Sequence, residues 1–391
     1  MSAATPKVSR LSQKIDTQMA RARHAGLLRQ RRALAIAKAG DETPNEFMLE
    51  GVSFINFSSN DYLGLSQASV LVEAMSQGSQ LYGVGSGASP LVTGYSEAHR
   101  QLEQALCEAS GHEAALLFCS GFSANSALMK TLFDRHDTVV ADKLIHASLI
   151  DGLRDSGAHL KRFAHNDIDA AVKLIATHQP QAVITESVFS MDGDCAPLGA
   201  LYQACQQAQS WLIVDDAHGF GVLPVAKQPR ASVSNCNVQV VTFGKALGCQ
   251  GAAILGSQAC IDFMVANARH YIYSTALSPA NAYVAYRAVK WLGESSKVAD
   301  TLLGIIDAFR RQCQQVGITL SDSVTPIQPI VIGELERLQA VTDGLKARGI
   351  WAGSIRPPTV PKGSARLRIT LNVNHTQAQL DHLIASLVEV L

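Results

Sequence analysis

Residues 211–219 read Trp-Leu-Ile-Val-Asp-Asp-Ala-His-Gly, an apolar run that ends in two carboxylates and an imidazole. A short apolar run bounded by polar and glycine residues is typical of a buried strand. Similar runs lie on both sides, at 114–118, 138–141, 160–163, 182–186, 238–242 and 252–255, and helical segments at 123–132, 147–155, 167–177 and 198–208 alternate with them. This alternation predicts an α/β fold with a mostly parallel central sheet covered by helices.

The sequence changes character after about residue 280. Helical segments at 281–292 and 297–315 are followed by strand-like runs at 327–332 and 365–371 and by an amphipathic helix from Gln377. We therefore expect a helical N-terminal arm over residues 1–50, a large α/β domain over 51–290 and a smaller α+β domain over 291–391. Three prolines in residues 356–361 predict a rigid, extended loop there.

Charge and composition exclude several classes of protein. The 33 Lys and Arg residues balance the 33 Asp and Glu residues, so no global field would attract nucleic acid or an anionic membrane. The eight cysteines form no C-x-x-C pair, so neither a structural metal site nor a disulfide framework is predicted. With no long apolar stretch and no apolar segment at the N-terminus, we expect a cytoplasmic protein.

The N-terminal arm is an exception to this balance. Residues 1–40 contain nine lysines and arginines and a single acidic residue, Asp16, a net charge of +8. The pattern is typical of the solvated face of an amphipathic helix. A transit peptide, which is also rich in arginine and poor in acidic residues, is the other ordinary interpretation.

Lys245 is the only charged residue between Arg230 and Asp262, and it follows the apolar run 238–242. Burial in such a setting lowers the pKa of a lysine and leaves part of it as the neutral amine that attacks carbonyl groups. The residue type and its surroundings thus indicate Schiff-base chemistry. The alternative is a lysine that snorkels to the surface from the end of a strand.

Asp215, Asp216 and His218 follow the run 211–214 directly. A carboxylate at the end of a strand can hold a pyridinium nitrogen in its protonated form, which makes the ring an electron sink, and a histidine three residues on can reach a ring oxygen. A metal site is the alternative, but neither an H-E-x-x-H motif nor a third ligand at helical spacing accompanies these residues.

A phosphate site is predicted near Gly121. Residues 117–125 run from a strand through a glycine turn into a helix, so free N–H groups at the start of the helix face a bound anion. His146 can either stack on a planar ring or cap a helix. Gly83, Gly85 and Gly87 form a degenerate dinucleotide fingerprint that follows no strand, so we interpret them as a turn or a close backbone approach.

Together these residues resemble the α-oxoamine synthases, a family of fold-type-I enzymes that depend on pyridoxal 5'-phosphate (PLP). The resemblance extends from about residue 50 to the C-terminus. It is carried by residues 56–65, 83–87, 120–122, 146–148, 187–194, 214–219, 242–245, 273–275 and 356–361. It implies a fold-type-I PLP-dependent transferase with PLP as cofactor and no metal.

The resemblance also implies catalytic roles for four residues. Lys245 would form the Schiff base with PLP and remove the Cα proton of the amino acid. Asp215 would contact the pyridine nitrogen, His218 the phenolic oxygen, and His146 the face of the ring.

Further cofactor contacts are implied at Gly121, Phe122, Ser190 and Thr242. Thr275 would reach the phosphate of the neighbouring subunit in a homodimer.

The implied substrate contacts lie in several segments. Asn60 and Arg368 match positions that hold the amino-acid carboxylate, although strand alternation places Arg366 on the same face as Arg368. Arg29 would contact the acyl chain, and Thr359 belongs to the same substrate-binding set.

The implied reaction is the decarboxylative condensation of L-alanine with a pimeloyl thioester, a step of biotin biosynthesis, with the acyl group on coenzyme A or on an acyl carrier protein. A sister synthase that uses glycine with acetyl-CoA or succinyl-CoA is the nearest alternative. An aminotransferase would share the lysine, the aspartate and the phosphate site, whereas a non-enzymatic scaffold would not need Lys245 in this place. The basic arm is a candidate for binding the anionic acyl donor.

Overall fold

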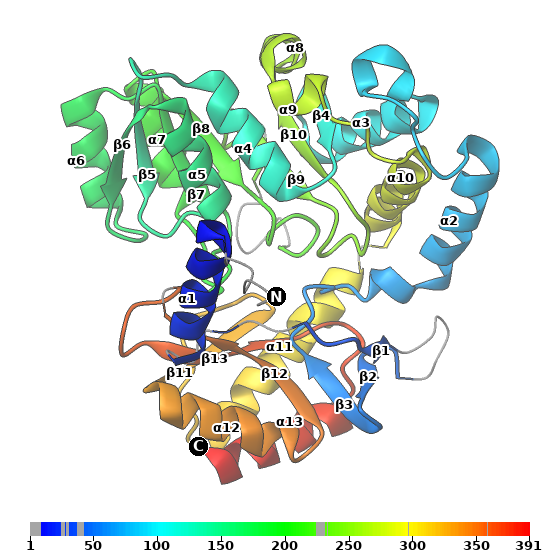
Figure 1. Cartoon of the computed structure of the whole chain (residues 1–391), viewed down its shortest axis with the longest axis vertical. Coiled ribbons are helices and arrows are strands. Elements are labelled where there is room, and N and C mark those ends of the chain that lie inside the picture. Colours follow the sequence, from blue (N-terminus) through cyan, green and yellow to red (C-terminus); the bar gives the residue numbers. More distant parts are fainter. Residues whose placement is uncertain are drawn as a thin grey trace, which may run out of the picture.

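The computed structural model describes residues 9–24, 28, 31–36, 43–223, 231–232, 234–295, 297–357 and 359–391. Within these residues the strands form a seven-stranded sheet and a six-stranded sheet, which occupy the upper and lower halves of Figure 1. Arg29 lies outside the described residues.

The seven-stranded sheet contains every strand predicted between residues 114 and 255. Its order is β4 (Ala114–Phe118), β10 (Ala252–Gly256), β9 (Val238–Thr242), β8 (Trp211–Asp215), β7 (Ala182–Glu186), β5 (Thr138–Asp142) and β6 (His159–Phe163). β10 is antiparallel to both of its neighbours, and the other pairs are parallel. A loop without a helix joins β9 to β10, and such a short connection permits only antiparallel pairing. The predicted, mostly parallel sheet is confirmed.

Helices cover both faces of this sheet. Because side chains alternate along a strand, Ile184 of β7 packs in the cluster of one face and Val183 in that of the other. The first face carries α4 (Gly121–Leu132), α5 (Ala147–Ser156), α8 (Gln258–Asn267) and α9 (Arg269–Ile272). The second carries α6 (Ile168–His178), α7 (Leu198–Gln207), α2 (Ser69–Tyr82), α3 (Glu97–Ser110) and α10 (Pro279–Glu294).

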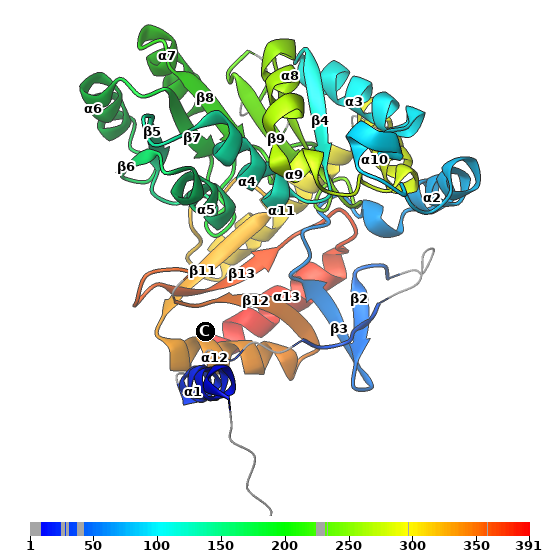
Figure 2. The same ribbon diagram turned by 45° about the horizontal axis from the view of Figure 1, so that its top comes forward.

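The second sheet combines both ends of the chain. Its order is β1 (Ala35–Ile36), β2 (Glu46–Leu49), β3 (Val52–Phe57), β12 (Ile350–Ile355), β13 (Ala365–Thr370) and β11 (Ile327–Gly333). Its helices are α11 (Lys297–Gln315), α12 (Leu335–Lys346) and α13 (Gln377–Val390). Figure 1 shows α12 and α13 on the side away from the large sheet, and Figure 2 shows α12 in the same place. One buried cluster contains Val241 of the large sheet and Leu367 of the second, so the two share a continuous core.

The division of the chain at residues 50 and 290 stays a prediction. β3 begins at Val52, inside the range assigned to the large domain, and it pairs in parallel with β12 of the second sheet, with Ile55 opposite Ile350. The predicted helical arm contains α1 (Arg10–His24), which has no buried residue, and then β1 and β2.

Two loop predictions can be compared with the structure. Residues 356–361 were expected to be extended, but the Thr359 N–H donates to the Arg356 carbonyl at 3.1 Å, so this segment contains a turn. Proline fixes φ near the value that the second residue of a β-turn requires, and Pro357 occupies that place. Gly83 and Gly87 have φ of 75° and 71° and no atom within 4 Å of an added Cβ, which matches the turn interpretation.

Two shorter helical turns, η1 (Leu65–Gln67) and η2 (Pro90–Gly94), complete the elements. No helix among the described residues combines the length and the apolar character needed to cross a bilayer.

Candidate active site

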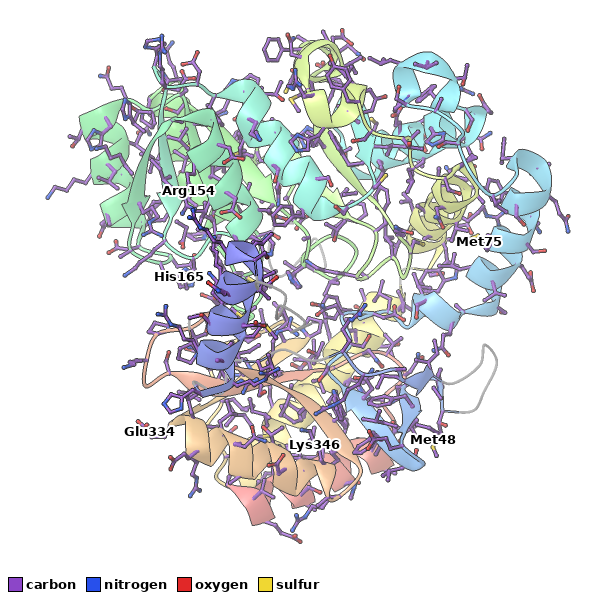
Figure 3. All side chains as sticks on the ribbon, viewed as in Figure 1. Met48, Met75, Arg154, His165, Glu334 and Lys346 are labelled. Carbon is purple, nitrogen blue, oxygen red and sulfur yellow. The ribbon has the colours of Figure 1, made fainter. Side chains whose placement is uncertain are left out.

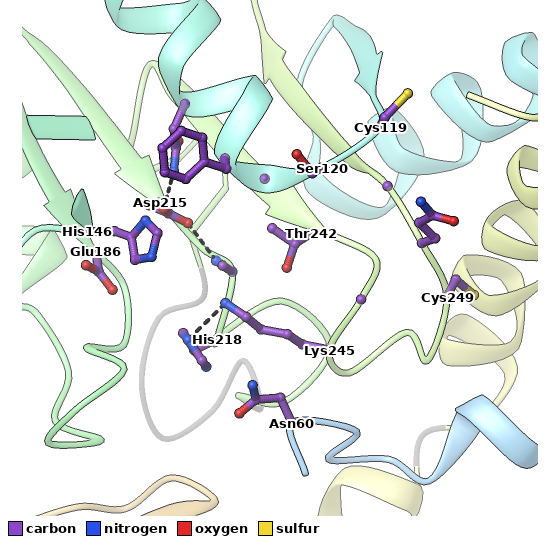
Figure 4. A pocket seen from close by; sticks show the side chains of 17 residues that line it. Asn60, Cys119, Ser120, His146, Glu186, Asp215, His218, Thr242, Lys245 and Cys249 are labelled. Carbon is purple, nitrogen blue, oxygen red and sulfur yellow. Dashed lines mark hydrogen bonds between the residues drawn. The ribbon is translucent and has the colours of Figure 1, made fainter. Parts of the chain in front are cut away.

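A pocket of about 430 Å³ opens at the carboxyl ends of the parallel strands (Figure 4). Each side of it comes from the residues that follow a different strand: Gly121 after β4, His146 after β5 and Lys245 after β9. Glu186 and Asp215 are the last residues of β7 and β8 and lie opposite each other in the sheet. This is where ligands bind in open α/β sheets.

Lys245 projects into this pocket. Its Nζ lies 2.9 Å from Nε2 of His218, so the alternative of a lysine that snorkels to the surface is wrong. Removal from water lowers the pKa of Lys245, although the charges of Asp215 and Glu186 oppose this effect. The lysine is therefore closer to its neutral, nucleophilic form than a lysine in water.

A chain of polar side chains continues from Lys245 through His218. The Tyr62 hydroxyl lies 2.6 Å from Nδ1 of His218 and 3.3 Å from Oδ1 of Asn60, which accepts a hydrogen bond from Nη2 of Arg368 at 3.2 Å. Burial and the positive charge of Lys245 hold the pKa of His218 well below its ordinary value, and burial raises the pKa of Tyr62 to about 12. At neutral pH His218 is thus an uncharged imidazole and Tyr62 keeps its proton.

Asp215 is fixed by a second network. Nδ2 of Asn125 donates to Oδ2 of Asp215 at 2.7 Å, and the Ala217 N–H donates to Oδ1 at 3.1 Å. Asn125 also contacts the hydroxyl of Ser148 at 3.0 Å, and that hydroxyl lies 2.7 Å from Nδ1 of His146, which caps α5. Both carboxylate oxygens of Asp215 are thus held in place by donors. No group of three His, Cys, Asp or Glu side chains suited to a metal occurs in the described part of the chain.

Glu186 is a carboxyl group that the sequence-based prediction missed. Only 4% of it is exposed, and burial together with the neighbouring charge of Asp215 raises its pKa well above the ordinary value, against the opposing charge of Lys245. Two adjacent buried carboxyl groups cannot both ionise cheaply. Glu186 therefore keeps its proton at neutral pH.

The start of α4 fits a phosphate group. The first N–H groups of a helix have no partner inside it, and α4 begins at Gly121. A Cβ at Gly121 would lie 2.5 Å from Cγ2 of Thr242, so only glycine leaves this space. The hydroxyl oxygen of Thr242 is buried without a hydrogen-bond partner among the described residues, so a ligand that accepts a hydrogen bond would satisfy it. Together with Lys245 and Asp215, these features fit PLP.

The structure brings most of the predicted site residues together and leaves others apart. The pocket is lined by Asn60, Gly121, Phe122, His146, Asp215, His218, Thr242 and Lys245. Ser190 does not line it, but its carbonyl accepts from Nε of Arg368 at 2.7 Å, whereas Arg366 pairs with Asp192. Thr275 and Thr359 are exposed residues outside the pocket. The prediction for Arg29 concerns a residue outside the described part of the chain.

Comparison with known proteins agrees with this geometry. The family model for class I and II aminotransferases matches residues 52–387. The 8-amino-7-oxononanoate synthase of Vibrio parahaemolyticus is 45% identical over 381 residues, which cover 97% of this chain and 98% of that protein. The chain belongs to the 8-amino-7-oxononanoate synthase family. The predicted resemblance and the predicted class of enzyme are confirmed.

Solved structures support the same fold. The crystal structure of 8-amino-7-oxononanoate synthase from Francisella tularensis is 32% identical, with a TM-score of 0.75 over 86% of this chain and 97% of that one. A structure of serine palmitoyltransferase (SPT) with a PLP internal aldimine is 23% identical, with a TM-score of 0.89 over 98% of both chains. Like these neighbours, this member of the synthase family has the predicted fold of the fold-type-I PLP enzymes.

The proton on Glu186 predicts a pH-dependent effect of Glu186→Gln on the free energy of unfolding. Its ordinary pKa is 4.5 and its folded pKa is higher, so above pH 4.5 the unfolded chain releases a proton that the folded chain keeps. Glu186 therefore makes the parent less stable as the pH rises. Glu186→Gln has no proton to release at this position and lacks this loss. In urea titrations of cofactor-free protein, the stability of Glu186→Gln relative to the parent should increase by up to about 3 kcal/mol from pH 5.5 to 7.5.

Glu334→Gln, at the exposed start of α12, is the matched control and should track the parent at both pH values. A pH-independent difference between Glu186→Gln and the parent would show that Glu186 is ionised in the folded protein.

Proposed function

We propose that the protein catalyses the PLP-dependent condensation of L-alanine with a pimeloyl thioester to 8-amino-7-oxononanoate, carbon dioxide and free thiol, in biotin biosynthesis. The relatives are named for the product 8-amino-7-oxononanoate. The carbon skeleton of this compound equals that of pimelate plus alanine, less the carbon lost as carbon dioxide. The observation that carries the proposal is the contact of Lys245 with neutral His218, beside the hydrogen-bonded carboxylate of Asp215. A non-enzymatic scaffold has no need of this arrangement.

Residues of two regions would hold the cofactor. Lys245 would carry PLP, Asp215 would contact its ring nitrogen, and Gly121 and Thr242 would contact its phosphate. Bound PLP supplies an electron sink that stabilises negative charge at the Cα of the amino acid. Of the other predicted cofactor contacts, Phe122, His146 and His218 line the same pocket.

Proton transfer at the amino acid is assigned to Nζ of Lys245. A general base works best when its pKa lies near the working pH, and burial shifts Lys245 in that direction. His218 stays uncharged and fixes the amine at 2.9 Å, while Tyr62 fixes the other ring nitrogen of His218. Through these contacts His218 and Tyr62 hold the Lys245 amine in one position in the pocket.

Arg368 and Asn60 are proposed to bind the alanine carboxylate. The guanidinium of Arg368 uses Nε on Ser190, Nη1 on Thr370 at 2.9 Å and Nη2 on Asn60. A guanidinium has five N–H groups, and these contacts use three of them. The remaining groups suit a carboxylate, which arginine binds in a bidentate manner.

A homodimer in the cytoplasm is part of the proposal. Val84, Val92 and Tyr273 are 84%, 73% and 72% exposed, and η2, which contains Val92, contacts α9 next to Tyr273. Exposed apolar side chains that gather in this way are typical of a surface covered by a second subunit. Thr275 would then act at the phosphate of the neighbouring subunit. Eight free cysteines support a reducing compartment.

The acyl donor is a thioester of coenzyme A or of an acyl carrier protein. Both are anionic, and the +8 charge of residues 1–40 favours encounter with either. The exposed helix α1 supports this role, in which Arg29 would contact the acyl chain and Thr359 the substrate.

Release of carbon dioxide from carboxyl-labelled amino acids tests the reaction. With PLP and pimeloyl-CoA, alanine should release carbon dioxide and glycine should release little. Preferred release from glycine with acetyl-CoA or succinyl-CoA would identify a sister synthase instead. Conversion of PLP to pyridoxamine phosphate with alanine alone would identify an aminotransferase.

Arg368→Lys tests the carboxylate site. Loss of the bidentate fork removes hydrogen bonds to a charged group worth about 1.5–3 kcal/mol, so the KM for alanine should rise about tenfold or more, and the KM for the thioester much less. Arg366→Lys is the control, because Arg366 is engaged by Asp192 and a lysine keeps the positive charge for that pair. A defect in alanine KM confined to Arg366→Lys would show that the carboxylate binds at Arg366.

A further inference from the structure

The loop between β7 and α7 connects the two sheets. We call residues 187–195 the interdomain loop. On its lower side, the Ser190 carbonyl accepts from Arg368, Asp192 pairs with Arg366, and the hydroxyls of Ser323 and Thr325 both donate to the Gly193 carbonyl at 2.9 Å. The loop therefore supplies one of the three contacts that hold the guanidinium of Arg368.

On its other side, the interdomain loop is held by one histidine. Nε2 of His165 lies 2.7 Å from Oδ2 of Asp194, and Nδ1 lies 3.0 Å from Oδ1 of Asp142, a fully buried residue at the end of β5. The imidazole also packs edge to face on Phe189, with ring centroids 4.4 Å apart. Figure 3 labels His165 at the level where the upper and lower halves of the molecule meet.

Asn166 repeats the same bridge. Its N–H donates to Asp142 at 2.9 Å, and its side-chain amide donates to Asp194 at 2.7 Å. Its φ of 54° is in the left-handed region, which asparagine adopts more readily than most residues other than glycine. The hydrogen bonds to Asp142 and Asp194 hold Asn166 in this conformation.

His165 faces both carboxylates as a cation. A neutral imidazole has one N–H donor and an imidazolium has two, so both carboxylates can accept only from the charged form. Burial lowers the pKa of His165, but the hydrogen bonds to Asp142 and Asp194 outweigh it and raise the pKa to about 9. Charge-assisted hydrogen bonds of this kind are roughly twice as strong as neutral ones.

We propose that His165 is a positioning residue for the amino-acid substrate: as an imidazolium bridge between Asp142 and Asp194 it fixes the interdomain loop, and through the Ser190 carbonyl it fixes Arg368. This inference rests on the proposed role of Arg368 in binding the alanine carboxylate. His165 itself does not line the pocket.

His165→Ala, with His159→Ala as an exposed control on the neighbouring strand β6, tests this role. Amide hydrogen exchange should become faster in residues 187–195 and in β13 of His165→Ala and should be unchanged in His159→Ala. The KM for alanine should rise about tenfold, while kcat and the KM for the thioester change less than about threefold. Asp194→Asn, which removes one end of the bridge, should reproduce both effects if His165→Ala does not fold.

If amide hydrogen exchange in the interdomain loop of His165→Ala equals that of the parent, the proposal is overturned, whether or not the protein uses alanine. A lower unfolding midpoint with an unchanged alanine KM overturns it as well, since His165 would then be only structural. Failure of the parent to release carbon dioxide from alanine contradicts the proposed function instead, and the exchange data still decide whether His165 fixes the loop.

Discussion

The parallel register of β7, β8 and β9 is the constraint on which the site depends. Parallel neighbours end at the same edge of the sheet, so Glu186 and Asp215 become direct neighbours, and the loop after β9 brings Lys245 to them. β4 and β5 end at the same edge and contribute the start of α4 and the cap of α5. Residues that are far apart in the sequence thereby line a single pocket, with hydrophobic strands buried on both faces beneath it.

Burial of these groups is costly and determines their protonation. An isolated charge loses its hydration in such a site, so proteins either pair it or neutralise it. His218 and Glu186 are held neutral, whereas Asp215 receives donors from Asn125 and Ala217. The pocket thus keeps one well-supported carboxylate next to an amine of lowered pKa. This is the electrostatic setting that a pyridinium ring and a nucleophilic lysine require.

Much of the large sheet could be predicted because most of its strands are short, mainly apolar runs between helical segments. β6, which contains Lys161 and Arg162, is the least apolar of them. β12 was missed because Ile350–Ile355 contains glycine and serine in place of a clear apolar pattern. No periodicity in the sequence indicates that β10 runs antiparallel to its neighbours β4 and β9. Lys245 could be found from its isolation, and Glu186 could have been found as the last residue of a predicted strand. Tyr62 and Asn125 have no such signal, because their partners His218 and Asp215 lie 156 and 90 residues away.

A crystal structure of the protein grown with PLP would test the central claim most directly. The account predicts continuous electron density from Nζ of Lys245 into the cofactor, with the carboxylate of Asp215 at the ring nitrogen and the phosphate between Gly121 and Thr242. Density joined to another lysine, or a phosphate bound away from the start of α4, would contradict it.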